Sequence, residues 1–257
     1  MKTRMNFWIL ALIAFALCGC GDSIGALDNT TDKTDETRKD ENKDDNVEVP
    51  AEETGMWESS FFVTEFVVPS KIKVARNAGQ HWLKITGVEY ITYLRDKTSQ
   101  SYKKAMEFAE FYSDTSYTGD IHPGLNRALA YPIEDITIYC EKDFDVEHPA
   151  GEPLDDVVKL EFKSFYEFIK NGYKYPENIP LGTSDKEGGI DYKLCLGDID
   201  ASLATLVHIH PFRSQLGGTT PLLHFASEPE TPGEYTFTLE MTTNGETLKT
   251  EFTHTFE

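Results

Sequence analysis

Apolar and polar residues alternate most strictly near the C-terminal end of the chain. Residues 235–242 place hydrophobic side chains at every second position, and residues 248–256 do so with Thr250 and His254 on the same face, while threonine, glutamate and lysine stand between them. A period of two puts those hydrophobic side chains on one face of a strand. Asn244-Gly245, between the two runs, is the strongest two-residue hairpin signal. The pattern therefore predicts a β-hairpin whose apolar face packs on another sheet.

Six further runs are typical of strands, because they are rich in β-branched and aromatic residues: 61–68, 82–86, 88–94, 136–140, 192–196 and 204–209. Glycine and proline turn signals separate several of them, at 188–189, 217–218 and 231–233. Many short strands with turns between them favour a mainly β fold, an all-β sandwich with one or two short helices.

Helical spacing occurs twice. Residues 155–170 have apolar side chains three and four positions apart, with Asp155 and Asp156 as start signals and Asn171-Gly172 as a stop. Residues 100–111 show a weaker version of the same pattern, which an alternating strand would also fit in part. We expect a helix at each place.

The first residues combine Lys2 and Arg4 with an apolar run over 7–17, which is too short to span a bilayer. This order is that of a secretory signal peptide, predicted over 1–19. Leu17-Cys18-Gly19-Cys20 resembles the bacterial lipobox. The resemblance implies that Cys20 is diacylated and begins the mature chain, with Cys18 a poorer alternative because Leu17 precedes it.

Residues 20–56 form the next predicted segment, a lipidated, acidic and flexible linker. From Gly21 to Met56 there are 12 acidic and 4 basic residues and almost no large apolar ones. Such a segment buries too little surface to offset the entropy of ordering, and like charges extend it. The composition therefore predicts a disordered tether that separates a folded domain from the membrane.

Residues 57–257 carry 32 acidic and 18 basic residues, and the whole chain has a formal charge of −20. A surface this acidic repels phosphate backbones, so we expect no nucleic-acid partner. Cations, basic proteins and neutral glycans remain compatible with it. We divide this part into a β-rich segment over 57–125 and a sandwich over 126–257.

The run 232–239 is similar to the penultimate strand of bacterial immunoglobulin-like modules. The stretches 136–145 and 148–151 resemble a region of uncharacterised Bacteroides-type surface or outer-membrane lipoproteins. The resemblance covers 126–257. It implies an immunoglobulin-like β-sandwich at the bacterial outer membrane, on its surface or periplasmic face, and it brings no catalytic residues.

Cys140 and Cys195 are the only cysteines outside the N-terminal segment. An oxidising envelope permits a disulfide between them, and two buried free thiols are the alternative. No Cys-x-x-Cys pair is present.

Two stretches have residue types that bind metals. His208 and His210 would share one face of a strand and hold one ion, with a third ligand from His224 or an acid, or they are simply polar residues facing solvent. Asp143 and Asp145 lie in an acidic stretch that would offer oxygen ligands, or it is an exposed loop.

No serine-hydrolase, zinc-protease or phosphate-loop motif is present, so the sequence assigns no catalytic residue and no cofactor. We expect a membrane-anchored lipoprotein that is a binding or structural module of the cell envelope. Its partners would be the membrane, through the N-terminal lipid, and a glycan or an envelope or host protein. The alternatives are an envelope glycan hydrolase and a pilus-like or scaffold subunit.

Overall fold

The computed structural model describes residues 57–77, 79–175, 188–209 and 221–257. They belong to a compact unit that spans Pro50–Glu257. The signal peptide, Cys20 and the acidic linker lie outside the described residues. The described part is mainly β, as the alternation predicts.

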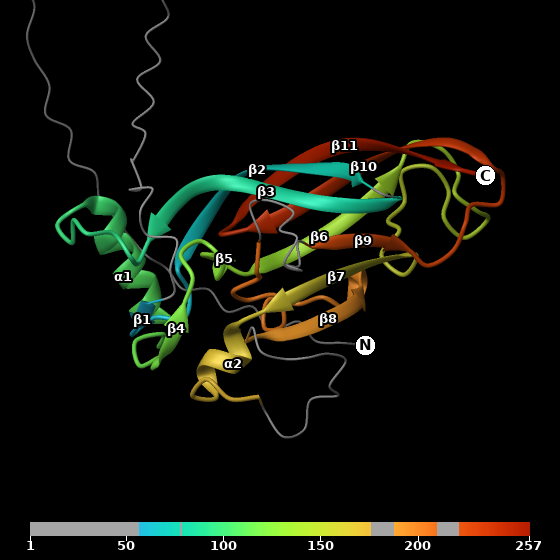
Figure 1. Ribbon diagram of the computed structural model, residues 1–257. Helices are drawn as coiled ribbons and strands as arrows, with labels where there is room; N and C mark the ends of the chain where they lie inside the picture. Colours follow the sequence, from blue (N-terminus) through green and yellow to red (C-terminus); the bar gives the residue numbers. More distant parts are fainter. Residues whose placement is uncertain (1–56, 78, 176–187, 210–220) are drawn as a thin grey trace, which may run out of the picture. The chain divides into compact units, whose positions relative to one another are not determined.

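Its elements in chain order are β1 Trp57–Ser59, β2 Glu65–Asn77, β3 Gln80–Ile91, α1 Gln100–Phe111, β4 Gly119–Ile121, β5 Arg127–Leu129, β6 Ile133–Cys140, β7 Val158–Ser164, α2 Tyr166–Lys170, β8 Ile190–Cys195, a 3-10 turn Leu196–Asp198, β9 Leu222–Phe225, β10 Gly233–Thr243 and β11 Glu246–Phe256 (Figure 1). No helix in the described part of the chain has both the length and the hydropathy needed to cross a bilayer.

The predicted C-terminal hairpin is confirmed. Strands β10 and β11 pair antiparallel from Gly233–Phe256 to Thr243–Glu246. Asn244 and Gly245 form the turn with φ of 51° and 73°, the left-handed backbone that this sequence favours. Strand β6 pairs with the other side of β10, which gives a three-stranded sheet in the order β11-β10-β6.

A six-stranded sheet in the order β5-β2-β3-β9-β7-β8 forms the second layer. Its pairs are antiparallel except β2 with β5. Strand β3 is continuous through both predicted runs 82–86 and 88–94 as far as Ile91. The register shifts at Pro69, and there Gly87 is required, since a Cβ on it would overlap the carbonyl oxygen of Val68.

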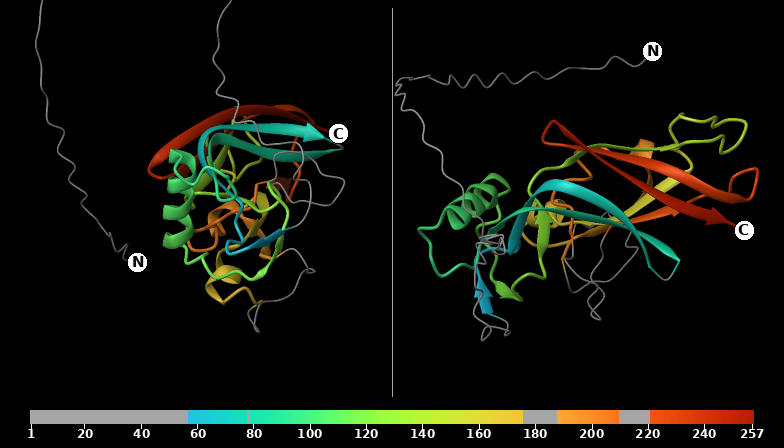
Figure 2. Two further views of the ribbon diagram at one scale, coloured as in Figure 1. Left: turned by 60° about the vertical axis from the view of Figure 1, so that its left-hand side comes forward. Right: turned by 90° about the horizontal axis from the view of Figure 1, so that it is seen from above.

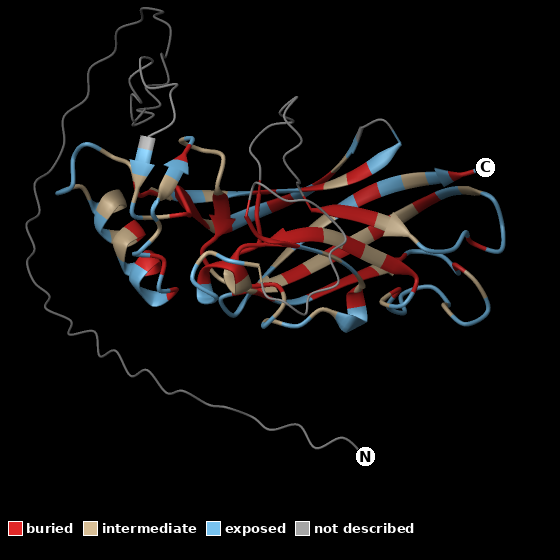
Figure 3. Ribbon diagram, turned by 60° about the horizontal axis from the view of Figure 1, so that its bottom comes forward, coloured by how far each residue is buried: buried red, intermediate tan, exposed pale blue. Residues whose placement is uncertain are grey.

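The main core is built from side chains of both sheets, whose strands Figure 2 shows from two further directions. Its largest fully buried side chains come from both layers: Leu83 and Phe162 from the six-stranded sheet, and Ile138, Tyr235 and Phe237 from the three-stranded one. Burying each large apolar side chain stabilises the fold by about 1.5–3 kcal/mol. Figure 3 shows the resulting alternation of buried and outward-facing residues along the strands.

A second apolar cluster packs beneath the helices. Helix α1 covers 100–111 as predicted, with the Ser99 side chain accepting a hydrogen bond from the Tyr102 N–H at its start. Its buried residues, Ala105, Phe108 and Ala109, pack among side chains that include Phe66 and others from 61–63 and 165–169. The cluster fixes the chain where β2 and β3 leave the main core.

The predicted helix over 155–170 is wrong. Residues 158–164 form strand β7, and only Tyr166–Lys170 are helical. Val158, Leu160 and Phe162 face the main core at a period of two, and β8 and β9 pair with the two sides of the strand. The strand is paired on both sides and one face of it is buried in the core, and this tertiary context overrides the helical spacing.

The predicted strand over 204–209 is also absent. Val207 and His208 form single bridges to Ser164 and Ala128, between turns on one side and the undescribed residues 210–220 on the other. The two predicted parts, 57–125 and 126–257, are not separate, because β2 and β3 share one sheet with β7, β8 and β9. Strands β1 and β4 form a small sheet of their own.

Candidate functional site

Of the four predicted metal ligands, the three that the structure describes do not form a site. His208 is buried, its Nε2 lies 2.9 Å from the Leu125 carbonyl oxygen, and its ring packs on Phe165. It is therefore a structural residue, not a solvent-facing one. His210 lies outside the described residues.

Asp143 and Asp145 hold the loop 141–153 together. Asp143 accepts a hydrogen bond from the Ala150 N–H, and Asp145 accepts one from Nδ1 of His148 at 2.8 Å. Burial acts to lower the pKa of His148, but bonds to Asp145 and Asp156 outweigh it and raise that pKa. Across the described residues, no group of three or more His, Cys, Asp or Glu side chains is placed to hold a metal ion.

The two cysteines do not form the disulfide considered from the sequence. Cys140 and Cys195 are both free. Cys140 faces the core from β6, and burial raises the pKa of its thiol. Cys195 ends β8 in the other sheet, half-buried, with Sγ 3.6 Å from the Asp156 carbonyl oxygen.

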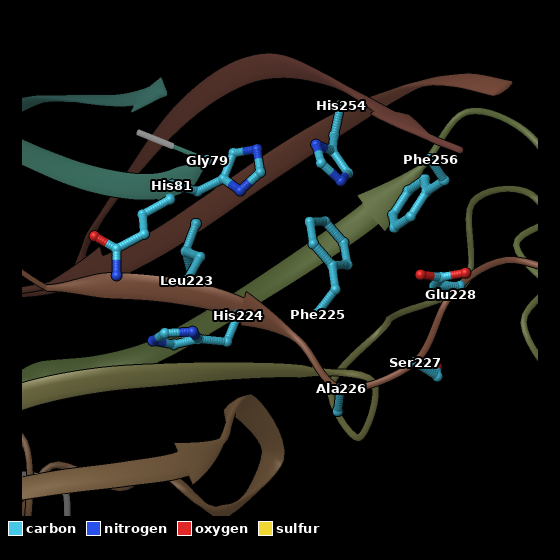
Figure 4. A pocket seen from close by; sticks show the side chains of 11 residues that line it. Gly79, His81, Leu223, His224, Phe225, Ala226, Ser227, Glu228, His254 and Phe256 are labelled. Carbon is cyan, nitrogen blue, oxygen red and sulfur yellow. The ribbon is translucent and has the colours of Figure 1, made fainter. Parts of the chain in front are cut away.

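A pocket opens between the two sheets where β3, β9 and β11 come together (Figure 4). We call it the histidine pocket. Its volume is about 390 Å³, within the range that holds small ligands. It is lined by Gly79, Gln80, His81, Leu223, His224, Phe225, Ala226, Ser227, Glu228, His254 and Phe256.

Pairing in the six-stranded sheet positions one side of this pocket. His81 on β3 is the register partner of Leu223 on β9, so both lie on the inner face with Phe225. His254 and Phe256 alternate with exposed residues on β11 and approach from the other sheet. Their rings form a connected group, in which Phe225 stacks on His254 at 5.4 Å and contacts Phe256 edge-on at 5.2 Å.

His81 and His254 are the most unusual groups of the pocket. Their ring centroids are 4.7 Å apart and their planes cross at 84°. His81 is 4% exposed, and its Nε2 and the Nδ1 of His254 are buried without a hydrogen-bond partner. A buried polar atom left without a partner costs about 1–3 kcal/mol, so a site that retains two of them is a candidate for ligand binding.

Both imidazoles are neutral at neutral pH. Burial, the neighbouring His254 and the Arg76 guanidinium lower the pKa of His81 to about 4. Burial and Arg76 also lower the pKa of His254. Each ring therefore offers one N–H donor and one nitrogen lone pair.

His224 borders the pocket but belongs to the other face of the sheet. Its Nε2 lies 3.0 Å from Glu161 Oε2, and Lys193 is 3.1 Å from the same oxygen. Burial and Lys193 lower the pKa of His224, against the opposite effect of Glu161. The third histidine is thus already paired.

Sequence reasoning missed this site. His81 and His254 stand far apart in the chain, one in a strand-like run and the other on the apolar face of the C-terminal hairpin. The one signal in the sequence was His254 itself, a histidine at a core-facing position of the predicted hairpin. The chain matches no protein-family model, no curated protein and no solved structure.

Proposed function

We propose that this chain is a lipid-anchored binding module of the bacterial cell envelope, built on an immunoglobulin-like β-sandwich, whose histidine pocket takes a neutral saccharide unit. The pocket is the observation that carries the proposal. The fold and the N-terminal lipobox supply its context, since a tethered sandwich presents the loops at its ends to partners.

Strand order supports the immunoglobulin-like assignment. A constant-type immunoglobulin sandwich has strands A, B, E and D in one sheet and C, F and G in the other. Here β2-β3-β9-β7 and β6-β10-β11 follow these orders in the same chain sequence, with antiparallel pairing throughout. Strands β5 and β8 extend the first sheet at its edges, and α1, β4 and β5 form an insertion between the B and C equivalents.

Tyr235 gives independent support. Immunoglobulin-like domains have a tyrosine near the start of strand F whose hydroxyl bonds back to the backbone a few residues upstream. Tyr235 stands near the start of β10, the F equivalent, and its hydroxyl donates to the Thr231 carbonyl oxygen at 2.6 Å.

The chemistry of the pocket suits a neutral saccharide. Aromatic faces bind the C–H groups of sugar rings, and amide, hydroxyl and carboxylate groups bind their hydroxyls. Phe225 and Phe256 give the pocket an apolar wall, with the face of Phe225 stacked on His254, and exposed Gln80, Ser227 and Glu228 provide the polar groups. The strongly acidic composition disfavours anionic ligands.

Saturation-transfer NMR with a panel of neutral mono- and disaccharides tests this function on the purified full chain in detergent. We expect transfer to at least one sugar, weakened in Gln80→Ala and Glu228→Gln, which change exposed positions without removing core side chains. Glu230→Gln is the matched control, because this exposed glutamate lies outside the pocket. Absence of transfer, or equal transfer in all variants, would contradict the proposal.

Within the part of the chain that the structure describes, no specific contact favours the hydrolase or the pilus-like alternative. The two most enclosed carboxyl groups among the described residues both serve the fold. Asp114 binds the backbone N–H groups of Phe62 and Val63, and Glu65 accepts from the Tyr93 hydroxyl and pairs with Arg127.

A further inference from the structure

Two buried imidazole nitrogens face each other in the histidine pocket. Figure 4 shows the rings of His81 and His254 pointing toward one another from β3 and β11, each with a nitrogen turned to the gap between them. The nitrogens without a hydrogen-bond partner are Nε2 of His81 and Nδ1 of His254. Since the two rings do not hydrogen-bond to each other, an ion or a water molecule between them would give both nitrogens a partner.

The spacing of the rings fits a shared metal ion. Imidazole nitrogens bind Zn²⁺ at about 2.0–2.1 Å, and two rings on one tetrahedral ion hold their centres roughly 5 Å apart. The observed centroid separation is 4.7 Å, with the planes at 84°.

Charges around the pair act in both directions. The Arg76 guanidinium lies across the β2–β3 pair from His81 and opposes a cation, but it is exposed and therefore screened by solvent. Glu228 lines the same pocket and favours a cation, as does the acidic composition of the chain. Because the repulsion from Arg76 is screened and Glu228 attracts cations, the charges around the two rings are compatible with a bound divalent ion.

We propose that His81 and His254 bind one divalent transition-metal ion of the Cu²⁺ or Zn²⁺ class. The described part of the protein supplies two imidazole ligands, and water fills the remaining positions, which face the pocket. Affinity then follows the order Cu²⁺ above Zn²⁺, while Ca²⁺ and Mg²⁺, which prefer oxygen ligands, do not compete. The ion shares the pocket of the proposed function, but its binding does not require a saccharide.

Titration of the metal-free full chain in detergent with Cu²⁺ or Zn²⁺ alone tests this site. We expect binding of one ion with excess Ca²⁺ and Mg²⁺ present, and two imidazole nitrogens in the electron paramagnetic resonance spectrum of the Cu²⁺ complex. His81→Gln and His254→Gln should each weaken binding by about tenfold or more and leave one nitrogen coupling. Circular dichroism checks that each variant is folded.

His224→Gln is the matched control, since this ring is paired with Glu161 on the other face of the sheet. His254→Gln changes a half-buried position and keeps the test valid if the more buried His81 variant does not fold. The proposal is overturned if the wild type binds neither ion, which would leave a water between the rings, or if the folded variants bind as the wild type does. Saccharide binding is measured separately, so either proposal can fail while the other stands.

Discussion

Asp114 carries a carboxyl group with no solvent exposure. Its two oxygens accept hydrogen bonds of 2.8 Å from the N–H groups of Phe62 and Val63, and the Tyr173 hydroxyl donates to Oδ1 at 3.0 Å. Burial raises its pKa from 3.8 to about 6, and these three bonds only partly oppose that rise. The native state therefore binds a proton here more readily than the unfolded chain does.

This shift predicts a pH dependence of stability. A raised native pKa gives a contribution that is fully present below about pH 3.8 and is lost as pH rises through about 6. Asp114→Asn cannot titrate and replaces one acceptor with a donor, so it should cost about 1–3 kcal/mol at acidic pH. The cost should be smaller at pH 8 than at pH 5 by about 1.4 kcal/mol, because at pH 5 the carboxyl is still mostly protonated in the native state and already mostly ionised in the unfolded chain.

Urea unfolding of wild type and Asp114→Asn at pH 5 and pH 8 measures this difference. Asp120→Asn changes an exposed carboxylate and should stay close to the wild type at both pH values. A cost of Asp114→Asn that is equal at the two pH values would contradict the assignment.

Single residues also show where sequence reasoning stops. His208 is a candidate metal ligand in the sequence because His210 is its near neighbour. In the structure its Nε2 lies 2.9 Å from the Leu125 carbonyl oxygen instead. No spacing along the chain links His81 to His254, because they lie in different sheets and only the approach of one sheet to the other brings them together. A site made of distant strands is not encoded in any spacing along the chain.

Among the elements, those with local signals were predictable. The hairpin β10–β11 has strict alternation and its turn residues, and α1 has both a capping serine and helical spacing. The segment 155–170 has Val158, Phe162 and Phe165 at helical spacing, while Val158, Leu160 and Phe162 also fit a strand. The pairing of β7 with β8 and β9 decided between the two, and that partner information is non-local.

Strand β10 gives a prediction about the proposed immunoglobulin-like fold. Tyr235→Phe keeps the ring, which packs in the core beneath Lys142, and removes only the hydroxyl that bonds to Thr231. We expect a loss of about 1–2 kcal/mol in unfolding free energy, since the carbonyl acceptor loses its partner. Urea denaturation measures it. Tyr139→Phe, on the outer face of β6, is the control and should change stability less, and equal losses in both variants would argue against a special role of this bond.

At the scale of the whole molecule, the alternation predicted a mainly β protein but not how its parts join. The sequence suggested a boundary near 125, whereas β2 and β3 complete a sheet with strands from beyond it. Such pairings join residues more than 130 positions apart, as in His81 with Leu223, and no local pattern reports them.

The proposed anchor decides which partners this pocket meets. Cys20→Ala should abolish incorporation of labelled palmitate and release the protein from membranes, because stable attachment needs the acyl chains at this residue. Cys18→Ala is the matched control and should keep both. Loss of palmitate in Cys18→Ala alone would move the anchor to the earlier cysteine, and loss in neither variant would remove the lipoprotein proposal.

Protease treatment of intact cells that express a C-terminally tagged chain then gives the side of the membrane. Loss of the tag, with a periplasmic control protein intact, would place the pocket at the cell surface, and host and neighbouring-cell glycans would then be the ligands to test. Protection of the tag would place the pocket in the periplasm, and saccharides of the cell envelope would then be the ligands to test. The same pocket would bind the same chemistry in both cases, so the compartment, not the fold, selects the physiological ligand.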